Sequence, residues 1–331
     1  MSHIFRSKRL LIVFSVIFFA CSGDSGTHPG DNYDVDFKEE MRTFVKEIGE
    51  FAHQQDSDFI LIPQNGHRLV STTAEDDGEP VSSYLNAVDG LGQEDLYYGY
   101  DDDNKATPAT ESEYMEYFLD LGLEAGKTIL VTDYCKDQSK MDDSFSKNSA
   151  NDYLSFAADH RELDNIPGYP ATIRNENDAD VTSLADAQNF LYLINPGEFS
   201  NKSSFLSALA ATNYDVIIMD AFFDDDWLNS SDLTQIRTKA NGGTRLLISY
   251  MSIGEAEDYR YYWGNNWKPG SPDWIVAENP NWKGNYKVAY WEADWKQYIF
   301  GTDDSYTQHL LNIGFDGAYL DIIEGFEYFE D

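Results

Sequence analysis

Apolar residues along the chain recur at the spacings expected of amphipathic helices and of short buried strands. The first helix is predicted by apolar residues three or four positions apart, namely Phe37, Met41, Phe44, Val45, Ile48 and Phe51. Similar apolar faces predict further helices at Tyr114 to Leu121, Tyr153 to Ala157, Phe205 to Leu209, Leu233 to Ile236 and Trp295 to Leu311. The chain therefore contains several helices, each with one face suited to packing on a core.

Between these helices lie apolar runs with the length of buried strands. There are eight of them, at residues 59–63, 87–90, 128–132, 190–194, 216–219, 246–249, 287–290 and 317–320. Strands that alternate with helices indicate a parallel sheet, and eight strands in about 270 residues are typical of a (β/α)8 TIM barrel. A doubly wound sheet is the alternative, but no GxGxxG or Walker-type loop follows any strand. We expect one α/β domain over residues 37–331, with an irregular connector at 165–187.

The first residues resemble an export signal. Three basic residues precede an apolar run at residues 10–20, which is too short to span a bilayer and suits a secretory signal. The run ends in Ala20-Cys21, so residues 1–21 are similar to a bacterial lipoprotein signal in which Cys21 becomes lipidated. An ordinary cleaved signal peptide is the alternative. Both predict export, and the first predicts a lipid anchor in the outer membrane or at the cell surface, with residues 22–36 as a flexible tether.

Composition narrows the classes of partner. The chain of 331 residues is 42% hydrophobic and 15% aromatic, so it can bury a large core. It carries 59 Asp and Glu against 23 Lys and Arg, and this negative charge disfavours nucleic acid as a partner. Beside Cys21 the chain has only Cys135, which leaves no intrachain disulfide. With no CxxC or HExxH motif, we expect neither a metal nor another cofactor.

Polar and aromatic side chains follow the predicted strands. They are Gln64, Asn65, Glu94, Asp133, Tyr134, Asp220, Tyr250, Glu255, Trp291 and Asp321. In a barrel the carboxyl ends of the strands meet at one mouth, so we expect these side chains to gather there. Carboxylates among aromatic rings suit a sugar site. For Asp133 and Asp220 taken singly, a helix N-cap is the competing interpretation.

Four segments together resemble a known family. They are Ser249 to Arg260 (SYMSIGEAEDYR), Gly314 to Asp321 (GFDGAYLD), Ile62 to Gly66 (IPQNG) and Asp89 to Tyr98 (DGLGQEDLYY). As a set they are similar to exported barrel proteins related to endo-α-1,4-polygalactosaminidase, glycoside hydrolase family 114. In that family the part like residues 190–329 comes first and the part like 37–164 follows. The resemblance thus implies a circularly permuted (β/α)8 barrel whose first family strand is Phe190 to Ile194.

The resemblance also implies roles for individual residues. Asp321, at the fifth strand of the family order, and Glu94, at the seventh, would be the catalytic carboxylates, with Asp321 as nucleophile or stabilising group and Glu94 as acid/base. The substrate subsites would be lined by Asp220, Glu255, Tyr250, Gln64, Asn65, Trp291, Asp133 and Tyr134. Glycoside cleavage uses two such carboxylates and needs no metal.

These observations predict an exported glycoside hydrolase that cleaves a polysaccharide containing amino sugars. A cationic galactosamine polymer is compatible with the acidic chain. Family members close to the characterised hydrolases have a cysteine-containing motif near the position of Glu94, where this chain has Gln-Glu-Asp, so the glycan itself is left open. The alternative from another class is a glycan-binding surface lipoprotein without catalytic activity.

Overall fold

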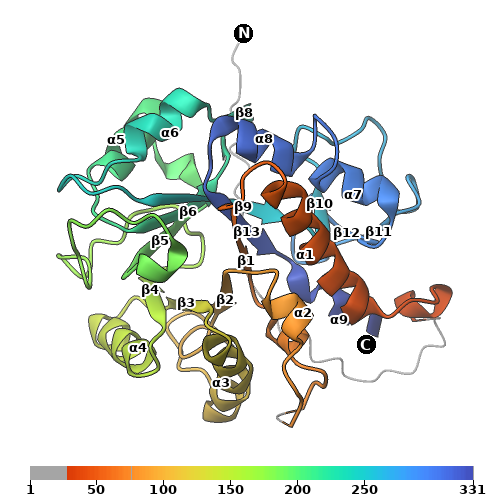
Figure 1. The fold of residues 1–331 in the computed structure, drawn as a ribbon, viewed down its shortest axis with the longest axis horizontal. Coiled ribbons are helices and arrows are strands. Elements are labelled where there is room, and N and C mark those ends of the chain that lie inside the picture. The colour runs from red at the N-terminus through yellow and green to blue at the C-terminus, as the bar shows by residue number, and fades with distance from the viewer. Residues whose placement is uncertain (1–27, 76, 331) are drawn as a thin grey trace.

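Parallel sheets surrounded by helices make up most of the computed structural model, which describes residues 28–75 and 77–330. The protein is a mixed α/β structure with mostly parallel strands, as the alternation of strands and helices predicts. Figure 1 shows the strands in the middle of the molecule and the helices around them. The expected signal peptide, Cys21 and the first part of the expected tether lie outside the described residues.

Eight parallel strands form two hydrogen-bonded sheets. The first sheet has the order β1 (Ile60–Pro63), β13 (Gly317–Asp321), β9 (Leu246–Ser252), β6 (Val216–Asp220) and β5 (Phe190–Leu193), and the second has the order β2 (Gly90–Glu94), β3 (Thr128–Tyr134) and β4 (Leu154–Ala158). An isolated parallel bridge between Gln64 and Gly92 joins β1 to β2. β4 lies next to β5 without a ladder between them.

Seven of the eight expected strands meet strands of these sheets, although residues 87–90 reach β2 only at Gly90, and one expectation is wrong. Residues 287–290 overlap β12 (Asn285–Val288), which pairs antiparallel with β10 (Glu255–Glu257) and β11 (Ile275–Glu278) in a separate small sheet. The eighth parallel strand is β4, where we expected a helix with Tyr153, Leu154 and Ala157. That helix ends earlier, as α4 (Gln138–Ala150). Apolar residues at positions one and four apart suit either a helix or a short strand in a stretch this brief, which explains the error.

The helices cover the sheets with the faces that the apolar spacing predicts. α1 (Phe37–His53) buries Met41, Phe44, Val45 and Ile48. The larger remaining helices are α3 (Ala109–Glu124), α5 (Lys202–Ala210), α6 (Ser230–Ile236), α7 (Ala293–Ile299) and α8 (Tyr306–Ile313), and the short ones are α2 (Ser82–Leu85) and α9 (Glu327–Glu330). The expectation of one helix from Trp295 to Leu311 is wrong, because residues 300–305 separate α7 from α8. α1 packs beside α8 and α9, so the two ends of the described chain are neighbours (Figure 1). Within the described ranges, none of the helices is long and apolar enough to cross a membrane.

The described part of the expected tether is packed on the domain. Residues 29–32 form a 3-10 turn closed by a capping box between His28 and Asp31. Tyr33 lies edge-on against Trp291, with ring centroids 4.8 Å apart, and also contacts Phe329. A Cβ atom on Gly30 would lie 2.0 Å from the carbonyl oxygen of Phe329, so only glycine fits this approach. The expectation of a free tether is therefore wrong for residues 28–36, because aromatic packing fixes them.

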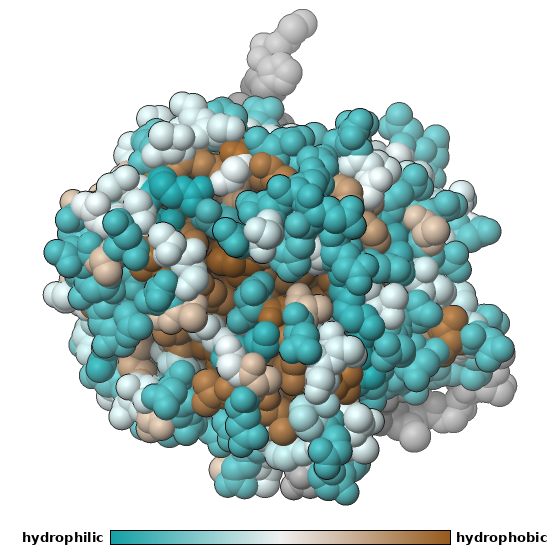
Figure 2. Space-filling view, in the orientation of Figure 1, coloured by the Kyte–Doolittle hydropathy of each residue, from teal (hydrophilic) through white to brown (hydrophobic). Residues whose placement is uncertain are grey.

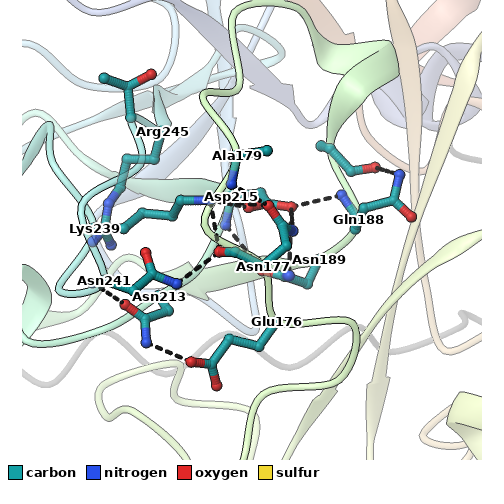
Figure 3. A network of polar contacts seen from close by, with 12 residues as sticks. Glu176, Asn177, Ala179, Gln188, Asn189, Asn213, Asp215, Lys239, Asn241 and Arg245 are labelled. Atoms are coloured by element: carbon teal, nitrogen blue, oxygen red, sulfur yellow. Dashed lines mark hydrogen bonds and ion pairs between the residues drawn. The ribbon is translucent and has the colours of Figure 1, made fainter.

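The connector is fastened at the amino ends of three strands. Asp215, directly before β6, accepts hydrogen bonds from Lys239 Nζ at 2.8 Å and from Asn177 Nδ2 at 2.9 Å. Both side chains of the Asp215–Lys239 ion pair are fully buried. Figure 3 shows how the side chains around Asp215 converge from the connector and from the turns before β5, β6 and β9. The connector contains no α-helix and is held by these polar contacts instead.

Candidate active site

The two carboxylates singled out from the sequence lie at the carboxyl ends of nearby strands. Asp321 ends β13 and Glu94 ends β2, and β1 runs between these strands with Gln64 and Asn65 just beyond its end. Because the three strands are parallel, their carboxyl ends meet at one edge. Asp321 and Glu94 are each only 2% exposed. The fold therefore gathers both groups, with Gln64 and Asn65, into one buried polar site.

Glu94 is held by donors on both of its carboxylate oxygens. The hydroxyl of Tyr134 donates a hydrogen bond to Oε1, and Asn65 Nδ2 donates to Oε2 at 2.9 Å. The backbone N–H of Glu94 in turn donates to Asn65 Oδ1 at 2.9 Å. Asn65 reaches this position with a φ of 61°, a left-handed conformation that asparagine tolerates well. These contacts fix the position of the Glu94 carboxyl group.

Asp321 is held on one side only. Its Oδ2 accepts a hydrogen bond from the hydroxyl of Tyr250 at 2.7 Å, whereas its Oδ1 is buried without a hydrogen-bond partner. Burial is the main cause that raises the pKa of Asp321 to about 7, and the negative charge of Glu94 is the next. The charge of Glu94 thus acts directly on Asp321. Burial and like charge are the two effects that enzymes use to keep a carboxyl protonated near neutral pH.

Two tyrosines that the sequence reasoning did not single out extend the site into the sheet interior. Tyr192 in β5 donates its hydroxyl to Gln64 Oε1 at 2.9 Å, and its ring lies 5.2 Å from that of Tyr319 in β13. A Cβ atom on Gly92 would lie 2.1 Å from the Tyr319 hydroxyl oxygen, so glycine makes room for this ring. Burial raises the pKa of both tyrosines, and the charges of Asp321 and Glu94 raise it further. A tyrosine within an otherwise aliphatic strand is the sequence signal that could have found them.

Glu324 is a third acidic group of the site. Burial raises its pKa well above the usual range, and the nearby charge of Asp321 is the next cause. Its Oε2 is buried without a hydrogen-bond partner. The chain reaches Glu324 through Ile322, which has a φ of 58°, a strained conformation for a β-branched residue. Such strain is often found where a functional site fixes the backbone.

Asp220 and Glu255 are bound to basic groups beside this site. Arg260 Nη1 lies 2.9 Å from both carboxylate oxygens of Asp220, and the Nε of the same arginine lies 2.5 Å from Glu257 Oε2. Glu255 Oε1 accepts from Asn279 at 2.8 Å and from Lys287 at 3.3 Å, while its Oε2 is buried and unpartnered. The charge of Glu255 contributes to the raised pKa of Asp321, which places Glu255 near the pair of Asp321 and Glu94.

Two expected subsite residues make other contacts. Asp133 is fully buried and binds the backbone N–H groups of Tyr97 and Tyr98 with Oδ1, and the Ser144 hydroxyl with Oδ2. Trp291 lies in an aromatic cluster with Tyr33, Phe37, Tyr290 and Phe329. Asp133 therefore holds the loop after β2, and Trp291 packs the chain ends together.

The helix-cap interpretation is wrong for both Asp133 and Asp220. The N-cap residue of α4 is Asp137 and that of α6 is Asn229.

In the described ranges 28–75 and 77–330, no group of three or more His, Cys, Asp or Glu side chains is arranged to hold a metal ion. The face of the molecule seen in Figure 2 is hydrophilic around its edge, and apolar residues reach the surface in its centre.

Comparison with known proteins gives relatives without an assigned function. Uncharacterized proteins of Methanocaldococcus jannaschii, Deinococcus radiodurans and Thermotoga maritima are 34%, 36% and 34% identical over 160, 124 and 120 residues. The matches cover 48%, 37% and 36% of this chain, and 43%, 37% and 36% of the respective relatives. The chain thus spans less than half the length of each of these relatives. No family model matches the chain.

Proposed function

We propose that the protein is a glycoside hydrolase in which Glu94 and Asp321 form the catalytic carboxylate pair. The observation that carries the proposal is the joint burial of the two groups, with the charge of Glu94 raising the pKa of Asp321. A pKa of about 7 keeps part of the Asp321 carboxyl protonated near neutral pH, and glycoside cleavage needs one protonated carboxyl. One carboxyl protonates the leaving oxygen, and the other attacks the sugar or activates water.

The resemblance and the contacts assign opposite roles to the two carboxyl groups. The resemblance assigns the acid/base role to Glu94 and the nucleophilic or stabilising role to Asp321. The contacts favour the reverse, because Tyr134 and Asn65 both donate to Glu94, as suits an ionised carboxylate, whereas Asp321 has the raised pKa. In a retaining mechanism azide rescue of the two variants decides between them: azide in place of a missing nucleophile gives a glycosyl azide of inverted configuration, whereas azide that displaces the enzyme carboxylate in an acid/base variant gives one of retained configuration.

The fold proposed for this site is a closed (β/α)8 barrel. The strand order β5, β6, β9, β13, β1, β2, β3 and β4 supports it, because successive strands are paired except at β4 and β5, which are neighbours. Counted from β5, Asp321 ends the fourth strand and Glu94 the sixth. The sequence predicted the fifth and seventh strands for these residues, because that count included residues 287–290, which belong to the antiparallel sheet.

The proposed substrate is a polysaccharide that contains amino sugars, acted on outside the cell. The net charge of -36 supports attraction of a cationic polymer, and the basic and apolar stretch before Cys21 supports export with a lipid anchor. Incorporation of labelled palmitate into the wild type but not into Cys21→Ser would support the anchor. An unlabelled but exported and shortened protein would indicate ordinary signal cleavage instead.

The test of activity is release of reducing ends from partially deacetylated galactosamine polymer, with neutral and N-acetylated glycans in parallel. We expect Asp321→Asn and Glu94→Gln to abolish cleavage while binding of the polymer remains. Asp137→Asn, an exposed acid near the end of β3, is the matched control and should cleave as the wild type does. Binding without cleavage in the wild type, unaffected by either variant, would instead establish the glycan-binding lipoprotein.

A further inference from the structure

An arginine just after β4, ahead of the connector, contacts a residue of the candidate active site. This residue, Arg161, is only 5% exposed. Its Cζ atom lies 4.0 Å from the centre of the Tyr134 ring. The hydroxyl of that ring donates to Glu94 Oε1. Arg161, Tyr134 and Glu94 therefore form one chain of contacts from the segment after β4 to a proposed catalytic carboxylate.

Arg161 is itself fixed by the loop that follows Glu94. Nη1 and Nη2 bind the two carboxylate oxygens of Asp95 at 3.0 and 2.6 Å, Nε binds Asp103 Oδ1 at 2.8 Å, and Nη2 also donates to the carbonyl oxygen of Gly99 at 2.9 Å. A Cβ atom on Gly99 would lie 1.9 Å from Asp95 Oδ1, so glycine is needed for this approach. A planar, bidentate and stacked arginine of this kind is not replaced by lysine without loss of geometry.

We propose that Arg161 is a positioning residue of the site: it fixes the Tyr134 ring by stacking and thereby fixes the hydrogen bond from Tyr134 to Glu94. The reaction affected is the proposed glycoside cleavage, so this part of the inference rests on the proposed function. The segment between β4 and the connector then has a role besides joining strands, because it supplies a residue that controls the geometry of the carboxylate pair.

The chain offers a matched control for this inference. Arg174, in the connector, lies over the Phe145 ring at 5.0 Å and donates to Asp142 Oδ1 at 2.9 Å. Arg174 thus makes the same two kinds of contact as Arg161 but does not touch Tyr134 or Glu94. Comparing Arg161→Lys with Arg174→Lys separates an effect on the site from a general effect of altering an arginine that contacts an aromatic ring and a carboxylate.

The first readout is independent of activity. The proton in the hydrogen bond from Tyr134 to Glu94 is observed by NMR at low temperature and assigned by its loss in Tyr134→Phe. We expect Arg161→Lys to shift or broaden this resonance and Arg174→Lys to leave it in place. The second readout is steady-state kinetics, where Arg161→Lys should lower kcat by about tenfold to 100-fold with little change in KM, because positioning affects the reacting geometry. Adding Arg161→Lys to Tyr134→Phe should lower kcat only slightly further.

Each result supports or overturns the inference. An unchanged resonance in Arg161→Lys overturns it, whatever the activity. A fall in kcat equal to that of Arg174→Lys also overturns it. If Arg161→Lys fails to fold, the double variant Arg161→Met with Asp95→Asn removes both charges of the buried pair and is measured instead. If the wild type cleaves no glycan, the proposed function fails, and the resonance alone decides whether Arg161 positions Tyr134.

Discussion

The side chain of Asn65 binds Glu94 twice, once through the carboxylate and once through the backbone. Asn65 Nδ2 donates to Glu94 Oε2 and Asn65 Oδ1 accepts from the Glu94 N–H, each at 2.9 Å. An amide side chain is needed for this pair of contacts, because only an amide offers a donor and an acceptor side by side. The contact links the end of β1 to the end of β2 and orients one of the two proposed catalytic groups.

Replacing Asn65 with aspartate tests this contact at nearly constant shape. Asn65→Asp removes the donor and puts a second carboxylate against Glu94, so one proton must be shared between them. We expect kcat to fall by about 100-fold or more, with the folded structure retained. The pH dependence of kcat and thermal unfolding, measured together with Asn65→Gly, which keeps the left-handed backbone, check the result. Wild-type kcat in Asn65→Asp would contradict the proposed role of the contact.

Tyr250 provides a prediction on pH dependence. Its hydroxyl stabilises the ionised form of Asp321, so Tyr250→Phe should raise the pKa of Asp321 further above about 7. If Asp321 acts in its ionised form, the acidic limb of the pH profile of kcat/KM moves to higher pH. If Asp321 acts as the acid, the basic limb of the profile moves to higher pH instead. A profile with both limbs unchanged would show that Asp321 does not control the rate.

Asp321 should also lower the stability of the folded protein at high pH. Its pKa is about 7 in the folded state and 3.8 in the ordinary case, so between these values the folded state keeps a proton that the unfolded state has lost. Stability therefore decreases as pH rises through this window, by up to about 4 kcal/mol for this group. We expect Asp321→Asn to be more stable than the wild type at pH 8, with a smaller difference at pH 4. Denaturant unfolding at both values measures the change.

Asp133 should behave as a structural residue. Its carboxylate accepts from two backbone N–H groups and from the Ser144 hydroxyl, all of them buried. Asp133→Ala leaves these donors without partners and should lower the free energy of unfolding by about 3 kcal/mol or more. Ser144→Ala removes one donor and should lower it by about 1 kcal/mol. A glycan affinity that falls without any loss of stability would instead indicate that Asp133 lines a subsite.

The buried Asp215–Lys239 ion pair lies at the amino ends of the strands, away from the candidate site. Substitutions in this pair should therefore lower stability without lowering activity. Removing one partner, as in Lys239→Met, leaves the Asp215 charge uncompensated and should lower the free energy of unfolding by about 3 to 5 kcal/mol. Adding Asp215→Asn should restore part of this loss. Activity per folded molecule should stay at the wild-type value in both variants, because the candidate site lies at the carboxyl ends. Unfolding curves and kinetics below the transition check both statements.

The sequence was sufficient for the class of fold and for the central acids of the site. Periodicity identified α1 and seven of the parallel strands, since long apolar faces and aliphatic runs are strong signals. It missed β4, whose sequence Leu-Ser-Phe-Ala-Ala is short and partly polar, and it took residues 287–290 for a barrel strand, because strand patterns do not reveal the direction of pairing.

The contacts around the site were less predictable than its acids. Glu94 and Asp321 stand where strands end, a position visible in the sequence. Tyr192, Tyr319 and Arg161 reach the site from β5, β13 and the segment after β4, and their contacts depend on how distant segments pack. Asp133 also stands at a strand end, but its carboxylate binds backbone N–H groups of a neighbouring loop. Its position in the sequence does not distinguish this role from ligand binding.

The missing ladder between β4 and β5 has a consequence for the evolution of chain order. The connector at 165–187 crosses the junction between β4 and β5, which lie next to each other without a ladder and, in the described residues, are joined by backbone hydrogen bonds only beyond their ends, from Ile194 and Asn195 to Leu163. At Gly30 and Phe329 the first and last described elements touch. A gene rearranged so that translation starts at β5 and stops after β4, with these touching ends fused, would keep every strand pairing. The same native contacts are thus compatible with two gene orders, and interconversion between them needs no new interface.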